Sequence, residues 1–157
     1  MNEAGRDHWQ NVYRTKSVDS VSWYQPSPDT TLKALERFGA GPYRSLIDIG
    51  AGTSSLARCL HLRGWNDLSV LDISDAALAH ARKAAGEGGK QIDWIAADIT
   101  RWQPPRQYDV WHDRAVFHFL TDAAQRASYK SALDTGLAAD GLAILATFDN
   151  LLTLPEN

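Results

Sequence analysis

Strand-like and helix-like patterns alternate along most of this chain, and this alternation constrains the fold more than any other feature. Short apolar runs typical of buried strands are separated by stretches in which apolar residues recur every three or four positions. The expected strands are Ser45–Ile49, Leu68–Asp72, Ile92–Ala96, Tyr108–His112 and Leu142–Phe148. Strands that alternate with helices form right-handed crossovers and a parallel sheet. The sequence therefore predicts a doubly wound α/β domain.

Capping and stop residues set the expected ends of the helices. Apolar spacing predicts a first helix over about residues 6–15. Asp29 is the expected N-cap of a second helix, which stops at Gly39. The other expected features are a helix ending at Gly64, a helix capped by Ser74 that ends at Gly86, and a last helix that carries Tyr129, Leu133 and Leu137.

Length and composition narrow the class of protein. The 157 residues fit one domain, which we expect to comprise a helical cover (1–40), a core (41–149) and a truncated tail (150–157). A net charge of −3 argues against a broad electrostatic grip on nucleic acid. The polar start and the lack of any apolar run of about 20 residues predict neither a secretory leader nor a membrane span. The single cysteine, Cys59, excludes an internal disulfide and a cysteine-built zinc site. We therefore expect a cytoplasmic protein without nucleic-acid, membrane or metal partners.

A glycine turn follows the first expected strand, in the segment Asp48–Ser55. Gly50 and Gly52 allow the backbone to turn tightly and to approach a ligand closely. The helix that follows offers free N–H groups and the positive end of its dipole. In a doubly wound fold, ligands bind outside the carboxyl ends of the strands, at the switch point beside the first strand. A purely structural turn is the alternative.

Two carboxylates favour a particular ligand for this turn. Asp72 ends the second strand, twenty residues after Gly52, where an acid can accept hydrogen bonds from ribose hydroxyls. Asp48 lies inside an apolar strand, where it would repel an anionic pyrophosphate but attract a cation. Ser55 also replaces the third glycine of a dinucleotide-binding turn. The pattern therefore favours S-adenosylmethionine (SAM), which carries a cationic ammonium and a sulfonium, over NAD.

A third carboxylate, Asp98, follows the third strand in the segment Ala97–Ile99. It can accept a hydrogen bond from an adenine amino group, while Ile99 packs on the ring. A loop aspartate that caps the next turn is the alternative. A glycine turn, a ribose acid and an adenine acid at three successive strand ends form a more specific signal than any one of them.

These motifs resemble those of the class I SAM-dependent methyltransferases, and the likeness covers roughly residues 8–148. That family has a Rossmann-like, mostly parallel sheet in the order 3-2-1-4-5. The family's first three motifs correspond to Asp48–Gly52, Asp72 and Ala97–Asp98, which resemble them in this order. A bacterial subgroup has segments that resemble Trp9–Tyr13, Val21–Gln25 and Asp113–Leu120. The subgroup is similar to the eukaryotic lysine methyltransferases of elongation factor 1A.

The resemblance implies roles for residues that the spacing alone does not explain. Tyr13 and Trp23 would help to close the cofactor pocket, and Asp113 would lie near the transferred methyl group. Asp113 and His118 are the candidate catalytic residues. Packing roles are the alternatives for Tyr13, Trp23 and His118. The full set expected at the cofactor is Tyr13, Trp23, Asp48, Gly50, Ala51, Gly52, Thr53, Asp72, Ile73, Ala97, Asp98, Ile99 and Asp113.

The sequence after the fifth strand departs from the family, whose members continue into a helix and an antiparallel hairpin. The fifth strand is then expected to be an exposed apolar edge, which favours association, so another chain or the tail is expected to cover it. The expected function is methyl transfer to an amine or another nucleophile of a small molecule or protein, by in-line displacement. The alternatives are a non-catalytic SAM-binding fragment or pseudoenzyme and, disfavoured by Asp48 and Ser55, an NAD-binding α/β protein.

Overall fold

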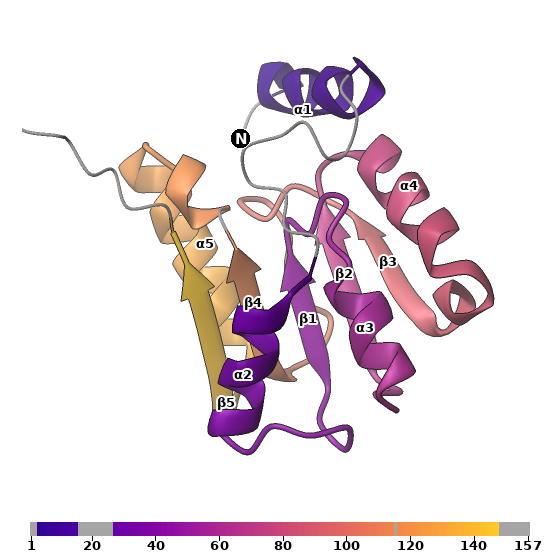
Figure 1. Cartoon of the computed structure of the whole chain (residues 1–157). Helices are drawn as coiled ribbons and strands as arrows, with labels where there is room; N and C mark the ends of the chain where they lie inside the picture. Colours follow the sequence, from indigo (N-terminus) through magenta and orange to yellow (C-terminus); the bar gives the residue numbers. More distant parts are fainter. Residues whose placement is uncertain (1–2, 16–26, 115, 148–157) are drawn as a thin grey trace, which may run out of the picture.

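A five-stranded parallel sheet forms the centre of the structure, a computed structural model that describes residues 3–15, 27–114 and 116–147 (Figure 1). The strands lie in the order β3-β2-β1-β4-β5, and each neighbouring pair is parallel. Their bounds are β1 Leu46–Ile49, β2 Leu68–Asp72, β3 Ile92–Ala96, β4 Tyr108–Arg114 and β5 Leu137–Ala146. The predicted fold class and strand order are confirmed.

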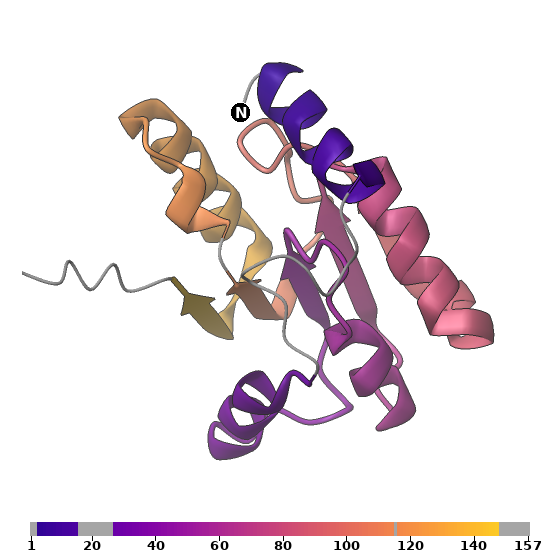
Figure 2. The same cartoon turned by 45° about the horizontal axis from the view of Figure 1, so that its top comes forward.

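Helices cover both faces of this sheet (Figure 2). Helices α2 and α3 lie on one face and α5 on the other, while α1 lies over the carboxyl ends of the strands near α4. The bounds of the helices are α1 Glu3–Thr15, α2 Asp29–Arg37, α3 Leu56–Leu62, α4 Asp75–Ala85 and α5 Ala123–Gly136, with 3₁₀ helices η2 Gly86–Gln91 and η3 Phe117–Phe119. No helix in these ranges is both long and apolar enough to cross a bilayer.

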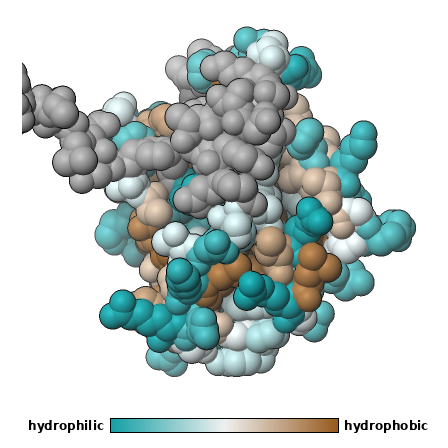
Figure 3. All heavy atoms as spheres, in the orientation of Figure 1, coloured by the Kyte–Doolittle hydropathy of each residue, from teal (hydrophilic) through white to brown (hydrophobic). Residues whose placement is uncertain are grey.

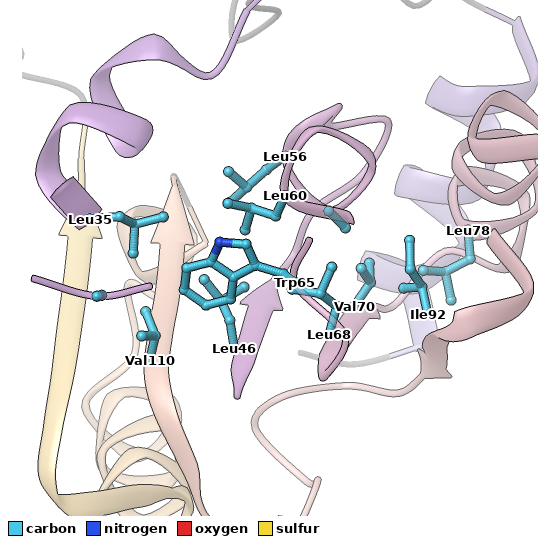
Figure 4. Close-up of a cluster of buried hydrophobic side chains, with 12 residues drawn as sticks. Leu35, Leu46, Leu56, Leu60, Trp65, Leu68, Val70, Leu78, Ile92 and Val110 are labelled. Carbon is cyan, nitrogen blue, oxygen red and sulfur yellow. The ribbon is translucent and has the colours of Figure 1, made fainter. Parts of the chain in front are cut away.

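Two apolar layers hold the helices on the sheet, and the alternation along β1 separates them. Leu46 faces the layer beneath α2, α3 and α4, in which Trp65 lies among Leu35, Leu60 and Val110 (Figure 4). Ile47 and Ile49 belong to the layer beneath α5. All four residues of β1 are buried, as expected for a strand covered on both faces.

The last helix and strand differ most from the sequence-based expectation. Leu137 was expected in the helix, but α5 ends at Gly136 and Leu137 opens β5, five positions before the predicted start at Leu142. Gly136 packs so closely that a Cβ there would lie 2.8 Å from ring atoms of Pro104 and Trp111. This close tertiary contact, which helical spacing does not reveal, accompanies the end of the helix.

Smaller boundaries differ as well: α1 begins three residues before its expected start, and β4 continues two residues past its expected end. Pro28, not Asp29, occupies the N-cap of α2, and Asp29 is the first helical residue, where its negative charge favours the helix dipole. The 3₁₀ helix η2, which begins at Gly86, has no counterpart in the sequence-based expectation. The Ser74 cap is confirmed, because its hydroxyl accepts a hydrogen bond from the Ala77 N–H.

Strand β5 lies at the edge of the sheet and pairs with no described strand on its outer side. Leu145 near its end is 42% exposed. On the face drawn in Figure 3, apolar side chains appear as small patches separated by hydrophilic ones. The expected self-association through β5 stays a prediction, and the expected tail 150–157 lies outside the described residues.

The close packing at Gly136 predicts a stability cost for a single methyl group. Gly136→Ala should lower the free energy of unfolding by about 1–3 kcal/mol, because the rings of Pro104 and Trp111 cannot give way cheaply. The matched control is Thr135→Ala, one position earlier and exposed, which should change stability by less than about 0.5 kcal/mol. Urea unfolding measures both, and a Gly136→Ala protein as stable as the wild type would contradict the packing argument.

Candidate functional site

The glycine turn lies at the carboxyl end of β1, in the middle of the sheet. Gly50 and Gly52 have φ of 61° and 56°, in the left-handed region that glycine adopts without steric cost. The Gly50 N–H donates to the Leu71 carbonyl at 2.6 Å, which holds the turn against β2. The turn predicted from the sequence is therefore present, at the position predicted for it.

The segment after β4 packs directly on this turn. A Cβ atom on Gly50 would lie 1.7 Å from Cγ2 of Val116, so no side chain fits there while Val116 keeps its place. Gly50 is thus required for two reasons, its backbone conformation and this close approach. The sequence indicated only the first of them.

Asp72 connects the glycine turn with the start of α4. Its Oδ2 accepts a hydrogen bond from the Gly52 N–H at 2.7 Å, and its Oδ1 accepts one from the Ser74 N–H at 2.8 Å. The side chain is buried, and this burial raises the pKa of Asp72 to about 6, although the backbone donors at Ser74 and Gly52 oppose the shift. The negative charge of nearby Asp48 raises this pKa further.

Asp48 takes part in a buried chain of three polar side chains. Its Oδ1 lies 2.6 Å from Nδ1 of His112, the residue opposite it on β4, and Nε2 of His112 lies 3.0 Å from the hydroxyl of Thr31 on α2. All three side chains are buried. The second oxygen, Oδ2 of Asp48, accepts no hydrogen bond from any residue that the structure describes. The sequence pattern indicates Asp48 but not the other two side chains, His112 and Thr31.

Asp113 at the end of β4 faces the other side of the sheet and holds the following loop. Its carboxylate accepts hydrogen bonds from the N–H groups of Val116 and Phe117 and from the hydroxyl of Tyr129, at 2.8, 3.1 and 2.6 Å. Burial raises the pKa of Asp113, and these donors oppose the shift. The expected roles of Asp113 and His118 stay predictions; His118 is half-buried with its ring edge-on to Phe119.

The third expected carboxylate, Asp98, lies in the turn after β3. It accepts hydrogen bonds from the N–H and hydroxyl of Thr100, at 2.9 and 2.7 Å. Ile99 is buried in the apolar layer beneath α5. The Ala97 N–H donates to the backbone carbonyl of Asp72 at 3.0 Å, so the ends of β2 and β3 are held together. Of the other expected residues, Ala51, Thr53, Ile73 and Ala97 are half-buried.

Helix α1 spans this edge of the sheet and contacts both of its sides (Figure 1). The Gln10 side-chain oxygen accepts hydrogen bonds from the Ser74 hydroxyl at 2.9 Å and the Ala76 N–H at 3.1 Å. Trp9 meets Phe119 edge-on, with ring centroids 5.1 Å apart. Helix α1 therefore bridges α4 and the segment after β4. The side chain of Tyr13 and all of Trp23 lie outside the described residues.

Comparison with known families classifies the chain. A sequence model of the family described as "Methyltransferase domain" matches residues 46–136, which include β1 to β4 and α5. The chain belongs to this methyltransferase family. The resemblance inferred from the motifs is thereby confirmed.

The curated proteins that this chain resembles differ widely in length. Malonyl-[acyl-carrier protein] O-methyltransferase 1 of Ilyobacter polytropus is 25% identical over 144 residues, which are 90% of this chain and 52% of that protein. The eEF1A lysine and N-terminal methyltransferase of Mus musculus is 22% identical over 118 residues, which are 74% of this chain and 17% of that protein. The chain thus spans about half or less of these relatives.

Solved structures show the same fold. The structure of the DhpI–SAM–HEP complex matches with a TM-score of 0.70 and 21% identity, and the match covers 95% of this chain and 67% of that one. At this level of identity the likeness concerns the arrangement of helices and strands.

The buried carboxyl of Asp72 predicts how stability varies with pH. Its pKa is about 6 in the folded chain and 3.8 for a free side chain, so between these values the folded form retains a proton that the unfolded form has lost. The stabilisation is complete below pH 3.8 and is lost as the pH rises towards about 6. The free energy of unfolding should fall by on the order of 3 kcal/mol across this window, and Asp72→Asn should remove that fall.

Asp109 provides a control of opposite sign. The Ser45 N–H and hydroxyl lower the pKa of Asp109, so its stabilisation is present above its unfolded pKa and is lost as the pH falls. Asp109→Asn should alter stability below about pH 4 and preserve the fall between pH 4 and 6. Urea unfolding at a series of pH values measures both variants. An Asp72→Asn protein with the wild-type slope would mean that Asp72 is already charged at pH 4.

Proposed function

We propose that this chain binds SAM at the carboxyl edge of β1 to β3 and transfers its methyl group to a nucleophile on a small molecule or a protein. The observation that carries the proposal is the carboxylate of Asp48, buried two residues before the glycine turn with Oδ2 unpartnered among the described residues. A buried acceptor of this kind normally has a partner. The ammonium group of a SAM amino-acid end supplies one, whereas a dinucleotide pyrophosphate would be repelled.

Asp72 is the proposed acceptor for the ribose hydroxyls. Each of its oxygens accepts one backbone N–H, and a carboxylate oxygen has a second lone pair that stays available. The bond from Gly52 also fixes Asp72 next to the turn. Asp98, with Ala97 and Ile99, is proposed at the adenine end, since it follows the neighbouring strand. Because Ile99 is buried in the core, any contact with the ring would use the part of its side chain nearest the surface.

For methyl transfer, the main task of the protein is to align the acceptor with the methyl group. SAM supplies a methyl group on a sulfonium whose departure as a neutral thioether needs no acid. The chain's residues then orient the acceptor and keep water away. Trp9 and Phe119 meet across the edge, and we propose that they exclude water with Tyr13 and Trp23. A base is required only where the acceptor must lose a proton, and His118 is the proposed candidate, because Asp113 already accepts three hydrogen bonds.

The relatives indicate the chemical type of the methyl acceptor. The relatives include an O-methyltransferase of malonyl-[acyl-carrier protein] and a lysine methyltransferase of eEF1A, so the fold serves both oxygen and nitrogen acceptors. For this chain we propose an amine or another nucleophile of a small molecule or a protein. A non-catalytic SAM-binding role is the second candidate, because Asp113, a candidate for proton transfer, already accepts three hydrogen bonds that hold a loop.

Binding measurements test the cofactor assignment. Calorimetry should show binding of SAM and S-adenosylhomocysteine and none of NAD. Asp72→Ala should weaken both by about ten- to a hundredfold, because a charge-assisted hydrogen bond to the ribose is lost. The control is Asp75→Ala, an exposed neighbour paired with Arg6, which should change affinity by less than about twofold. Binding of NAD without either SAM or S-adenosylhomocysteine would overturn the assignment.

Turnover separates an enzyme from a binding module. Incubation with methyl-labelled SAM and a cell extract should transfer label to a protein or a small molecule, and denatured chain is the control. Malonyl-[acyl-carrier protein] and a lysine-rich protein serve as defined probes of oxygen and nitrogen acceptors. Normal binding of S-adenosylhomocysteine with no transfer above the denatured control would favour the non-catalytic role.

A further inference from the structure

The buried chain Thr31–His112–Asp48 joins three elements that are far apart in the sequence. Thr31 belongs to α2, His112 to β4 and Asp48 to β1, and these residues are 7%, 3% and 2% exposed. Asp48 and His112 face each other in the parallel pairing of β1 with β4. Apolar residues of the core, Leu46 and Val110, precede them on the same face of the two strands.

Chemistry determines which group donates and which accepts in the hydrogen bond between Asp48 and His112. A carboxylate only accepts, so the proton between Asp48 and His112 belongs to Nδ1 of the imidazole, whether the ring is neutral or charged. The other ring nitrogen, Nε2, is held by the Thr31 hydroxyl at 3.0 Å. His112 is therefore fixed at both ends, and Oδ1 of Asp48 is fixed by His112 at 2.6 Å.

This arrangement leaves Asp48 with one oxygen engaged and one free of described partners. Without His112, either oxygen of Asp48 could take any donor near the turn. The buried carboxylate would also lose a hydrogen bond, which costs free energy. We propose that His112 and Thr31 are positioning residues that keep Oδ2 of Asp48 in place for the ammonium group of SAM. This inference rests on the proposed function and adds two residues that do not touch the cofactor.

The same hydrogen bonds could serve only to hold α2 on the sheet. Two ligands, one with and one without the amino-acid end, distinguish this role from positioning. S-adenosylhomocysteine carries the amino-acid end, whereas 5′-methylthioadenosine has the adenosine and sulfur without it. Loss of positioning should weaken only the first ligand. Loss of helix docking should weaken both ligands or neither.

Calorimetry on matched variants makes this comparison. His112→Leu should weaken S-adenosylhomocysteine about tenfold or more and Thr31→Val about three- to tenfold, with 5′-methylthioadenosine changed by less than about twofold. His112→Asn retains a donor near Nδ1 and Thr31→Ser retains the hydroxyl, so each should recover most of the affinity. The docking control is Leu35→Ala, which removes apolar contact of α2 with the sheet and should affect the two ligands in parallel.

The possible outcomes separate the two proposals. A wild-type chain that binds neither ligand would overturn the proposed function, and the positioning roles with it. A wild type that binds both, with variants that lose both ligands equally or neither, would overturn the positioning roles alone. Thermal unfolding of each variant identifies loss of fold, and Thr31→Val, which exchanges a hydroxyl for a methyl of similar size, retains the test if His112→Leu does not fold.

Discussion

The hydrogen bonds of the Asp72 carboxylate are the interactions on which the other contacts at the carboxyl edge of the sheet depend. The carboxylate accepts hydrogen bonds from the N–H groups of Gly52 in the glycine turn and of Ser74, the N-cap of α4. The backbone carbonyl of the same residue binds Ala97 after β3. Gln10 of α1 then attaches to Ser74 and Ala76. One buried acid thus sets the relative positions of three strand ends and of the helix that covers them.

Three acids are buried at this edge, and each has a different partner. Asp72 has backbone N–H groups, Asp48 has an imidazole, and Asp113 has backbone N–H groups with the hydroxyl of Tyr129. Burial of carboxylates costs free energy unless hydrogen bonds or charges compensate. The raised pKa values of Asp72 and Asp113 show that the compensation is incomplete. Three buried carboxylates at one edge would repel a phosphate, which agrees with the cationic ligand proposed for this site.

Much of the sheet follows from the sequence because its local signals agree with its packing. Strands β2 and β3 have the predicted bounds, since each is a short, mostly apolar run that follows an expected helix end, at Gly64 and Gly86. The start of β5 was missed because Leu137 fits a helical spacing, while Gly136 lies in a close contact with Pro104 and Trp111 that no local pattern encodes. Local pattern thus predicts which elements exist, and contacts between distant residues decide where some of them end.

In the candidate site, too, some features follow from local sequence pattern and others depend on contacts between distant residues. The glycine turn, Asp72 and Asp98 could be placed because a parallel sheet brings its carboxyl ends to one edge. The partnership of Asp48 with His112 could not be read from either residue alone, since it depends on the register between β1 and β4. Once those strands are neighbours, a buried acid and a buried imidazole at opposed positions form a pair.

The turn and the segment after β4 cannot rearrange independently. Val116 occupies the space that a side chain at Gly50 would need, and Val116 is itself held through its N–H by Asp113, which is fixed by Tyr129 of α5. A displacement of α5 would therefore reach the turn through Asp113 and Val116, on the opposite face from His112. Asp113 thus influences the turn by holding its neighbour in place, which needs no contact between its carboxylate and a ligand.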